Sequence, residues 1–82
     1  MIATAEKRPD IKELRYMMGD TLKSLAEKLG VTPDAISKWE RGMRAVETRT
    51  RLAYAYVYEI EDLDEVDWDF KRNKWLDEQD NR

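Results

Sequence analysis

The feature that most constrains this chain is a glycine between two helix-like runs. The stretch SLAEKLGVTPDAISKWERG covers residues 24–42, with Gly30 at the end of the first run and Thr32 before the second. Glycine tolerates the left-handed backbone that a tight turn needs. Threonine caps the start of a helix, and Pro33 suits the first helical position, where its missing N–H has no cost. Two helices joined by so short a turn must cross at a fixed angle.

Helical periodicity continues on both sides of this turn. Asp10 and Glu13 are spaced like a capping box before a first helix that stops at Gly19. A fourth helix is expected from about Glu47, and a short fifth helix at 62–66. The residues predicted to face the core are Ile11, Leu14 and Met18; Leu22, Leu25, Ala26 and Leu29; Ala35, Ile36 and Trp39; Leu52, Ala53, Tyr56 and Ile60; and Leu63 and Val66. The pattern predicts an all-α fold.

Composition narrows the class of protein. A length of 82 residues suits one small domain. The sequence has no cysteine, which excludes disulfides and thiolate metal sites, and no histidine, the commonest general base and metal ligand. No apolar run approaches the roughly 18 residues of a membrane span, and the N-terminus lacks the apolar stretch of a secretory signal. We expect a cytoplasmic protein that is not an enzyme and carries no metal or cofactor.

The net charge of −3 conceals an asymmetry along the chain. Residues 1–58 hold 11 Lys or Arg against 8 Asp or Glu, a net +3, whereas residues 59–82 hold 4 against 10, a net −6. The acidic run EIEDLDEVDWD offers oxygen donors, but it lacks the glycine and the regular ligand spacing of a calcium loop. We therefore interpret it as a solvated acidic face that repels DNA and orients the domain, and we predict no metal site.

The helix that follows the turn carries a polar ridge that points outward. Its residues Asp34, Ser37, Lys38 and Arg41 fall at i, i+3, i+4 and i+7. Two helices joined by a glycine-containing turn define a helix-turn-helix, whose second helix lies in the major groove of DNA. The ridge therefore predicts that residues 33–41 enter the groove.

The sequence IKELRYMMGDTLKSLAEKLGVTPDAISKWERG resembles the first three helices of the Cro/phage-repressor (XRE-type) helix-turn-helix family. LAEKLGV, a Thr N-cap, an inward Ile and WERG carry the likeness, which covers roughly residues 10–66. The resemblance implies a compact five-helix, lambda-repressor-like domain that binds double-stranded DNA, usually as a dimeric transcriptional regulator of bacteria or phages. Arg15 and Glu40 match a family pair that forms a partly buried salt bridge between the first and third helices. Residues 1–9 are then an N-terminal arm, and residues 67–82 an aromatic and acidic C-terminal extension.

Three departures from the family concern the DNA target more than the fold. Leu22 stands where the family often has a Gln that braces a phosphate. Pro33 and Asp34 stand where Gln, Ser or Arg usually begin the recognition helix, and the loop after Gly42 reads MRAVE in place of a basic residue followed by Asn-Pro.

The residues expected to contact DNA lie on and beside the ridge: Thr21, Lys23, Thr32, Pro33, Asp34, Ser37, Lys38, Arg41 and Arg44. Ser37 and Lys38 are expected near base edges, the two arginines and Lys23 near phosphates, and the threonines at contacts through their hydroxyl or backbone groups. Two interpretations of Asp34 stay open. It accepts a hydrogen bond from cytosine N4 in the groove, or it stabilises the helix N-terminus and pairs with Lys38 at i+4.

The aromatic residues beyond position 66 are the second informative feature. Trp68, Phe70 and Trp75 either fold back over the chain's own helices or form an interface. We expect a dimer or partner interface, because Trp anchors are enriched there and specific DNA affinity normally needs two half-sites about 34 Å apart. The expected function is a repressor that reads the major groove as a homodimer. The alternative is an interaction module, such as an antitoxin or anti-regulator, whose acidic aromatic tail binds a protein partner.

Overall fold

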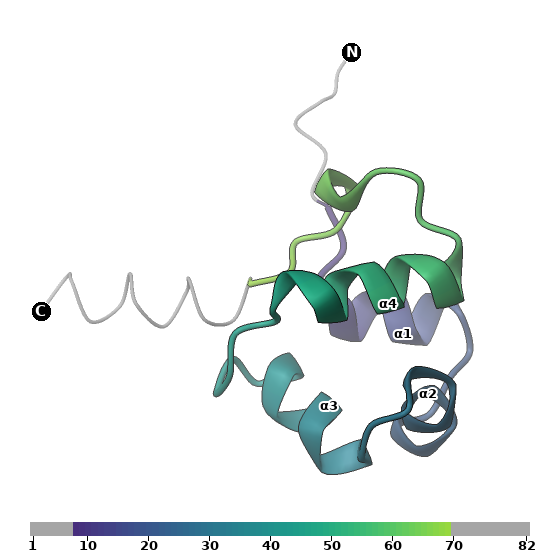
Figure 1. Cartoon of the computed structure of the whole chain (residues 1–82), viewed down its shortest axis with the longest axis vertical. Helices are drawn as coiled ribbons and strands as arrows, with labels where there is room; N and C mark the ends of the chain where they lie inside the picture. Colours follow the sequence, from purple (N-terminus) through teal and green to yellow (C-terminus); the bar gives the residue numbers. More distant parts are fainter. Residues whose placement is uncertain (1–7, 70–82) are drawn as a thin grey trace, which may run out of the picture.

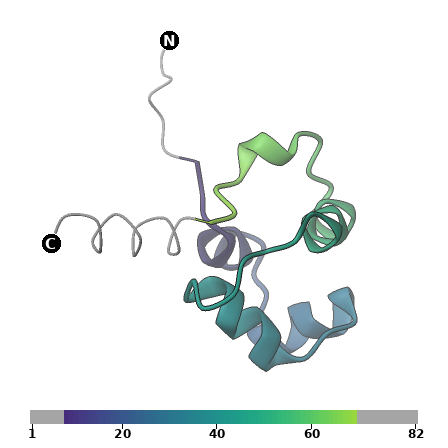
Figure 2. The same ribbon diagram turned by 60° about the vertical axis from the view of Figure 1, so that its left-hand side comes forward.

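The computed structural model describes residues 8–69. Its helices are α1 (Ile11–Met17), α2 (Leu22–Leu29), α3 (Pro33–Glu40), α4 (Thr48–Tyr58) and the short 3₁₀ helix η1 (Leu63–Glu65). The axes of α1 and α4 are roughly aligned, with α2 and α3 on one side of them and η1 on the other (Figures 1 and 2). The all-α class is confirmed for this range, in which no helix has the length and apolar composition needed to cross a bilayer. The expected fifth helix is a single 3₁₀ turn.

The helix ends follow the local sequence signals. Asp10 and Glu13 form the predicted capping box, in which each carboxylate accepts from the other residue's backbone N–H at 2.9 and 3.0 Å. Gly30 ends α2 in the left-handed conformation, with a φ of 75°. Thr32 caps α3 by accepting from the Ala35 N–H at 3.1 Å. The turn between α2 and α3 is therefore built as the sequence predicts.

Tyr54 of α4 lies at the centre of the core. Its side chain is fully buried and meets Trp39 of α3 and Trp68 edge-on, with ring centroids 6.4 and 5.5 Å away. Edge-to-face pairs of this kind contribute about 0.5–1.5 kcal/mol beyond the area that they bury. The other buried apolar residues are Ile11, Leu14, Leu25, Ala26, Ile36, Val46, Tyr58 and Val66. Aromatic rings thus join α3 to α4.

The predicted inward faces of α1 and α4 are wrong at three positions. Leu52 and Tyr56 are 55% and 87% exposed. Tyr54 and Tyr58 point inward in their place, because the run LAYAYVY is apolar around the whole helix and its periodicity selects no single face. Met18 is exposed because it lies at the C-cap, beyond the last residue of α1, where the helical phase no longer directs it inward.

The segment after η1 packs onto the domain, so the folded unit extends past residue 66. Trp68 Nε1 donates to the Leu63 carbonyl at 2.8 Å. Because Trp68 is only 6% exposed and fills the space beside the central tyrosine, the expectation that it forms a dimer or partner interface is wrong. Phe70 and Trp75, the other two aromatic residues of that expectation, lie outside the described residues, as do residues 1–7 of the expected arm.

A buried carboxylate, Asp20, ties the loop after α1 to α2 and α4. It accepts hydrogen bonds from Lys28 Nζ at 2.9 and 3.0 Å, from Ser24 Oγ at 2.8 Å and from the Tyr58 hydroxyl at 2.7 Å. These donors, Lys28 foremost, lower the pKa of Asp20 to about 2. Nothing in the local sequence around Asp20 indicates this role, because two of its three partners are distant along the chain.

The Asp20 contacts predict a pH-dependent loss of stability. Asp20→Asn is expected to lower the free energy of unfolding at neutral pH by about 1.5–3 kcal/mol, because hydrogen bonds to a charged group are lost. The pKa of Asp20 is lowered in the folded state from 3.8, so its contribution is fully present above that pH and disappears as the pH falls through about 2. Urea denaturation should show a smaller difference between variant and wild type at low pH. A difference that does not change with pH would contradict the assignment.

The two buried tyrosines of α4 predict opposite results for one substitution. The Tyr58 hydroxyl donates to Asp20, whereas the Tyr54 hydroxyl has no hydrogen-bond partner among the residues described. Tyr54→Phe is therefore expected to leave the free energy of unfolding unchanged or to raise it by up to about 1 kcal/mol, and Tyr58→Phe to lower it by about 1–3 kcal/mol. Thermal and urea denaturation measure both, and the reverse order would show that the hydrogen bonding is assigned wrongly.

Candidate nucleic-acid interface

Small and apolar side chains hold α2 and α3 together as a helix-turn-helix. Ala26 is buried beneath the turn, and its carbonyl accepts from the N–H groups of Gly30 at 2.9 Å and Val31 at 3.1 Å. Leu25 of α2 and Ile36 of α3 are fully buried in the same core. One face of α3 is thereby fixed inward, which leaves its other face available for a ligand.

The polar ridge lies on this second face of α3. Asp34 and Arg41 are exposed, and Ser37 and Lys38 are half-buried. Lys38 Nζ lies 3.1 Å from Asp34 Oδ2, in side chains that are 36% and 69% exposed. The i,i+4 ion pair of the second interpretation of Asp34 is therefore present, and both charged groups remain accessible. Arg41 Nε donates to the Ser37 carbonyl at 3.3 Å, which directs its guanidinium along the surface of α3.

The remaining residues expected at DNA flank the ridge. Lys23 and Arg44 are exposed, and Pro33 occupies the first turn of α3. The hydroxyl groups of Thr21 and Thr32 accept from backbone N–H groups at 3.0 and 3.1 Å, so both side chains serve as helix caps at the surface. None of the nine expected residues is buried.

Arg15 of α1 and Glu40 of α3 form the ion pair that the family resemblance implies. Arg15 Nε lies 2.7 Å from Glu40 Oε2 and Nη2 lies 3.0 Å from Oε1, a bidentate contact between buried side chains. Nη1 donates to the Asp20 carbonyl at 3.1 Å. The hydrogen bond to Glu40 raises the pKa of Arg15 above its already high ordinary value. Because both contacts are directional, the pair fixes the position of α3 against α1.

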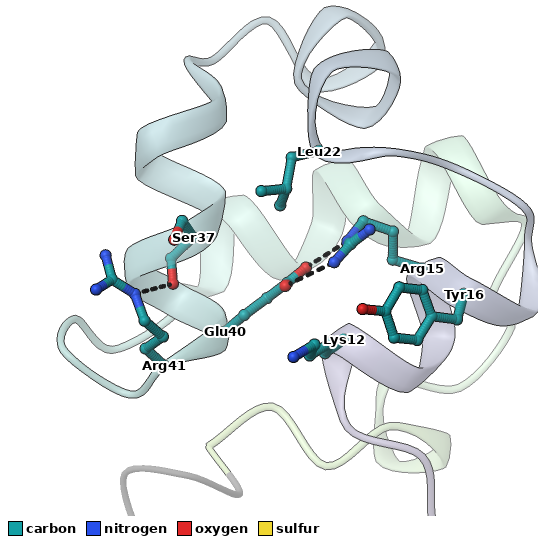
Figure 3. Close-up of a pocket in the computed structure, with 7 residues that line it drawn as sticks. All are labelled: Lys12, Arg15, Tyr16, Leu22, Ser37, Glu40 and Arg41. Atoms are coloured by element: carbon teal, nitrogen blue, oxygen red, sulfur yellow. Dashed lines mark hydrogen bonds and ion pairs between the residues drawn. The ribbon is translucent and has the colours of Figure 1, made fainter.

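A pocket of about 440 Å³ opens between α1 and α3, beside this ion pair (Figure 3). Its lining residues are Lys12, Arg15, Tyr16, Leu22, Ser37, Glu40 and Arg41. Figure 3 shows Lys12 and the Tyr16 hydroxyl directed toward the space in front of the ion pair. Glu40 is engaged by Arg15, and among the lining residues that fall within 8–69 no further carboxylate balances the positive charges of Lys12 and Arg41. The pocket is suited to an anion.

Lys12 and Tyr16 are functional candidates that the helix-turn-helix motif does not indicate, because they lie on α1, outside it. The sequence nevertheless contains a signal for them: Lys12, Arg15 and Tyr16 stand at i, i+3 and i+4 and therefore share one face of α1. The Arg15 guanidinium lies 4.7 Å and Lys12 Nζ 5.9 Å from the centre of the Tyr16 ring, so the three side chains form one cluster. Leu22 adds an apolar wall where the family often has Gln.

The acidic run lies at the other end of the molecule. Glu61, Asp62, Asp64 and Glu65 are exposed around η1, on the side of α1 and α4 that faces away from α3 (Figure 1). Between Arg8 and Asp69 there is no group of three His, Cys, Asp or Glu side chains positioned to hold a metal ion.

The arrangement defines a helix-turn-helix DNA-binding domain. The helix-turn-helix family model HTH_3, the Cro/C1 type, matches residues 11–61, more than half of the chain. The protein therefore belongs to the Cro/C1-type (XRE) helix-turn-helix family, whose members are DNA-binding domains of transcription regulators rather than enzymes. No curated protein and no solved structure matches the chain.

The Arg15–Glu40 contact predicts strong coupling between the two residues. Glu40→Leu or Arg15→Met alone leaves its partner as an unpaired buried charge and is expected to lower the free energy of unfolding by about 3–5 kcal/mol. The double variant Arg15→Met/Glu40→Leu replaces the pair with apolar side chains and is expected to recover much of that loss. Chemical denaturation of the four proteins measures the coupling. Losses that simply add would contradict a direct buried contact.

Proposed function

We propose that the protein is a sequence-specific transcriptional repressor that binds double-stranded DNA as a homodimer. It would act in the bacterial cytoplasm, on an operator of bacterial or phage origin. In this mechanism α3 enters the major groove of each half-site, where its ridge faces the base edges. The observation that carries the proposal is the combination of a braced inner face and an accessible polar outer face on α3. Glu40 and Trp39 fix the helix, while Ser37 and the Lys38–Asp34 ion pair lie on its accessible face.

Phosphate contacts are proposed on both sides of the ridge. Lys23, Arg41 and Arg44 are exposed cations at the start of α2 and the end of α3. Lys12 is added to them, because it lines the same pocket as Arg41 and a phosphate is an anion that fits this charge pattern. Thr21, Thr32 and Pro33 are proposed to lie where the N-terminal ends of α2 and α3 approach the DNA backbone, since helix N-termini favour phosphate.

The homodimer is proposed on energetic grounds. One helix reaches few base edges, so specific affinity is usually gained from two half-sites on one face of the duplex. Trp68 belongs to the core. We therefore propose that the dimer contact uses the other two aromatic residues of the extension, Phe70 and Trp75.

A second candidate function is favoured by the acidic surface around η1. Figure 2 shows η1 on the side of the fold away from α3, and the exposed carboxylates on and before η1 would complement a basic protein partner. In this alternative the protein is an antitoxin or anti-regulator that holds its partner through the acidic surface and the extension. The two functions use different faces and can operate in one molecule.

The salt dependence of DNA binding tests the proposed phosphate contacts. Arg41→Ala and Lys12→Ala are each expected to weaken binding to all duplexes to a similar degree, and to reduce the slope of log affinity against log salt by about 0.9. Fluorescence anisotropy with a duplex selected from a random pool measures both quantities. Arg8→Ala is the control, because Arg8 donates to the carbonyl of Asp64 within η1, away from α3. Wild-type affinity and slope in both test variants would contradict the proposed interface.

A further inference from the structure

The recognition helix carries one exposed carboxylate on its polar ridge, and this carboxylate is held beside a lysine. Asp34 and Lys38 are one turn apart on α3, with Oδ2 and Nζ separated by 3.1 Å. Neither side chain is buried, and Lys38 is the charged partner that Asp34 contacts within residues 8–69. The ridge therefore presents an acceptor and a donor side by side at the end of α3 that begins after the turn.

A carboxylate in the major groove lies between two rows of phosphates, which repel it. It can be accommodated where it accepts hydrogen bonds from a base, and the donors in this groove are the amino groups of cytosine N4 and adenine N6. Adenine N6 lies between two acceptors, adenine N7 and thymine O4, so a carboxylate approaching it meets lone pairs on both sides. Cytosine N4 has an acceptor, guanine O6, on one side only.

The major-groove edge of a C·G base pair has the complementary pattern to this ion pair. Cytosine N4 is a donor, and guanine O6 and N7 are acceptors. N4 and O6 are adjacent, because they hydrogen-bond to each other within the base pair. Asp34 and Lys38 offer an acceptor next to a donor at a similar separation.

We propose that Asp34 and Lys38 act as one unit that reads a single C·G base pair in one orientation, an inference that rests on the proposed function. Asp34 accepts from cytosine N4, and Lys38 donates to guanine O6 and N7. The ion pair fixes which base lies on which strand, because exchanging the bases places guanine O6 against the carboxylate. This assignment unites the two interpretations of Asp34, because the ion pair with Lys38 positions the carboxylate to accept from cytosine N4.

Exchanging the two charges tests the orientation directly. The double variant Asp34→Lys/Lys38→Asp keeps an i,i+4 ion pair but reverses donor and acceptor along the helix. Wild type and variant are titrated with four duplexes that differ only at the base pair that a random-pool selection places under α3. Wild type is expected to prefer C·G over the other three pairs by about tenfold or more, and the exchanged variant to prefer G·C by a similar factor. Circular dichroism of both proteins confirms that the helices are retained.

A single substitution provides an independent test. Asp34→Asn replaces a pure acceptor with a group that both donates and accepts, which matches adenine N6 and N7. The preference at this position is expected to move from C·G to A·T, while preferences elsewhere in the site stay unchanged.

The outcomes separate this inference from the proposed function. If wild type binds with sequence preference but both variants keep its ranking of the four duplexes, the pair does not read the base and the inference is overturned. Tighter binding of Asp34→Asn to all four duplexes, with no change in ranking, overturns it as well, since Asp34 then only repels phosphates. If wild type binds none of the duplexes, the proposed function falls, and the inference falls with it.

Discussion

The position of the recognition helix depends on the buried contact between Arg15 and Glu40. Two parallel hydrogen bonds, at 2.7 and 3.0 Å, fix both the distance and the direction of α3 relative to α1. Arg15 also holds the loop after α1 through the Asp20 carbonyl, and the Asp20 side chain in turn receives the Tyr58 hydroxyl. One polar network therefore connects α1, α2, α3 and α4, and it ends beside the pocket that is proposed to receive a phosphate.

Two kinds of side chain hold α3 in place. Aromatic rings around Tyr54 hold α3 from the core side, and the polar network holds it from the α1 side. Neither set of contacts involves the side chains of Ser37, Lys38 and Asp34, so changes on the outward ridge leave the bracing of α3 in place. This arrangement explains how a helix-turn-helix can keep its fold where its recognition helix departs from the family pattern at Pro33 and Asp34.

Local signals in the sequence predicted the helix ends, the turn and the outward ridge, because capping, glycine conformation and helical phase depend on near neighbours. The face of α4 could not be predicted in this way, since Leu52, Tyr54 and Tyr56 form an apolar surface all round and only packing decides between them. The role of Asp20 was missed, and the choice between core and interface for Trp68 could not be made, because Tyr58 and Tyr54, their respective partners, lie far along the chain. Within the candidate site, Lys12 could have been found from its spacing to Arg15, whereas the pocket itself required the fold.

Chemical-shift mapping by NMR tests the central claim most directly. The isotope-labelled protein is titrated with a duplex selected from a random pool, at low and at high salt. The account predicts that the largest backbone shift changes fall in residues 33–44, with further changes at Lys12 and at the start of α2, and that they diminish as salt is raised. Changes confined to the acidic surface around η1, or no change in α3 with any duplex, would contradict it.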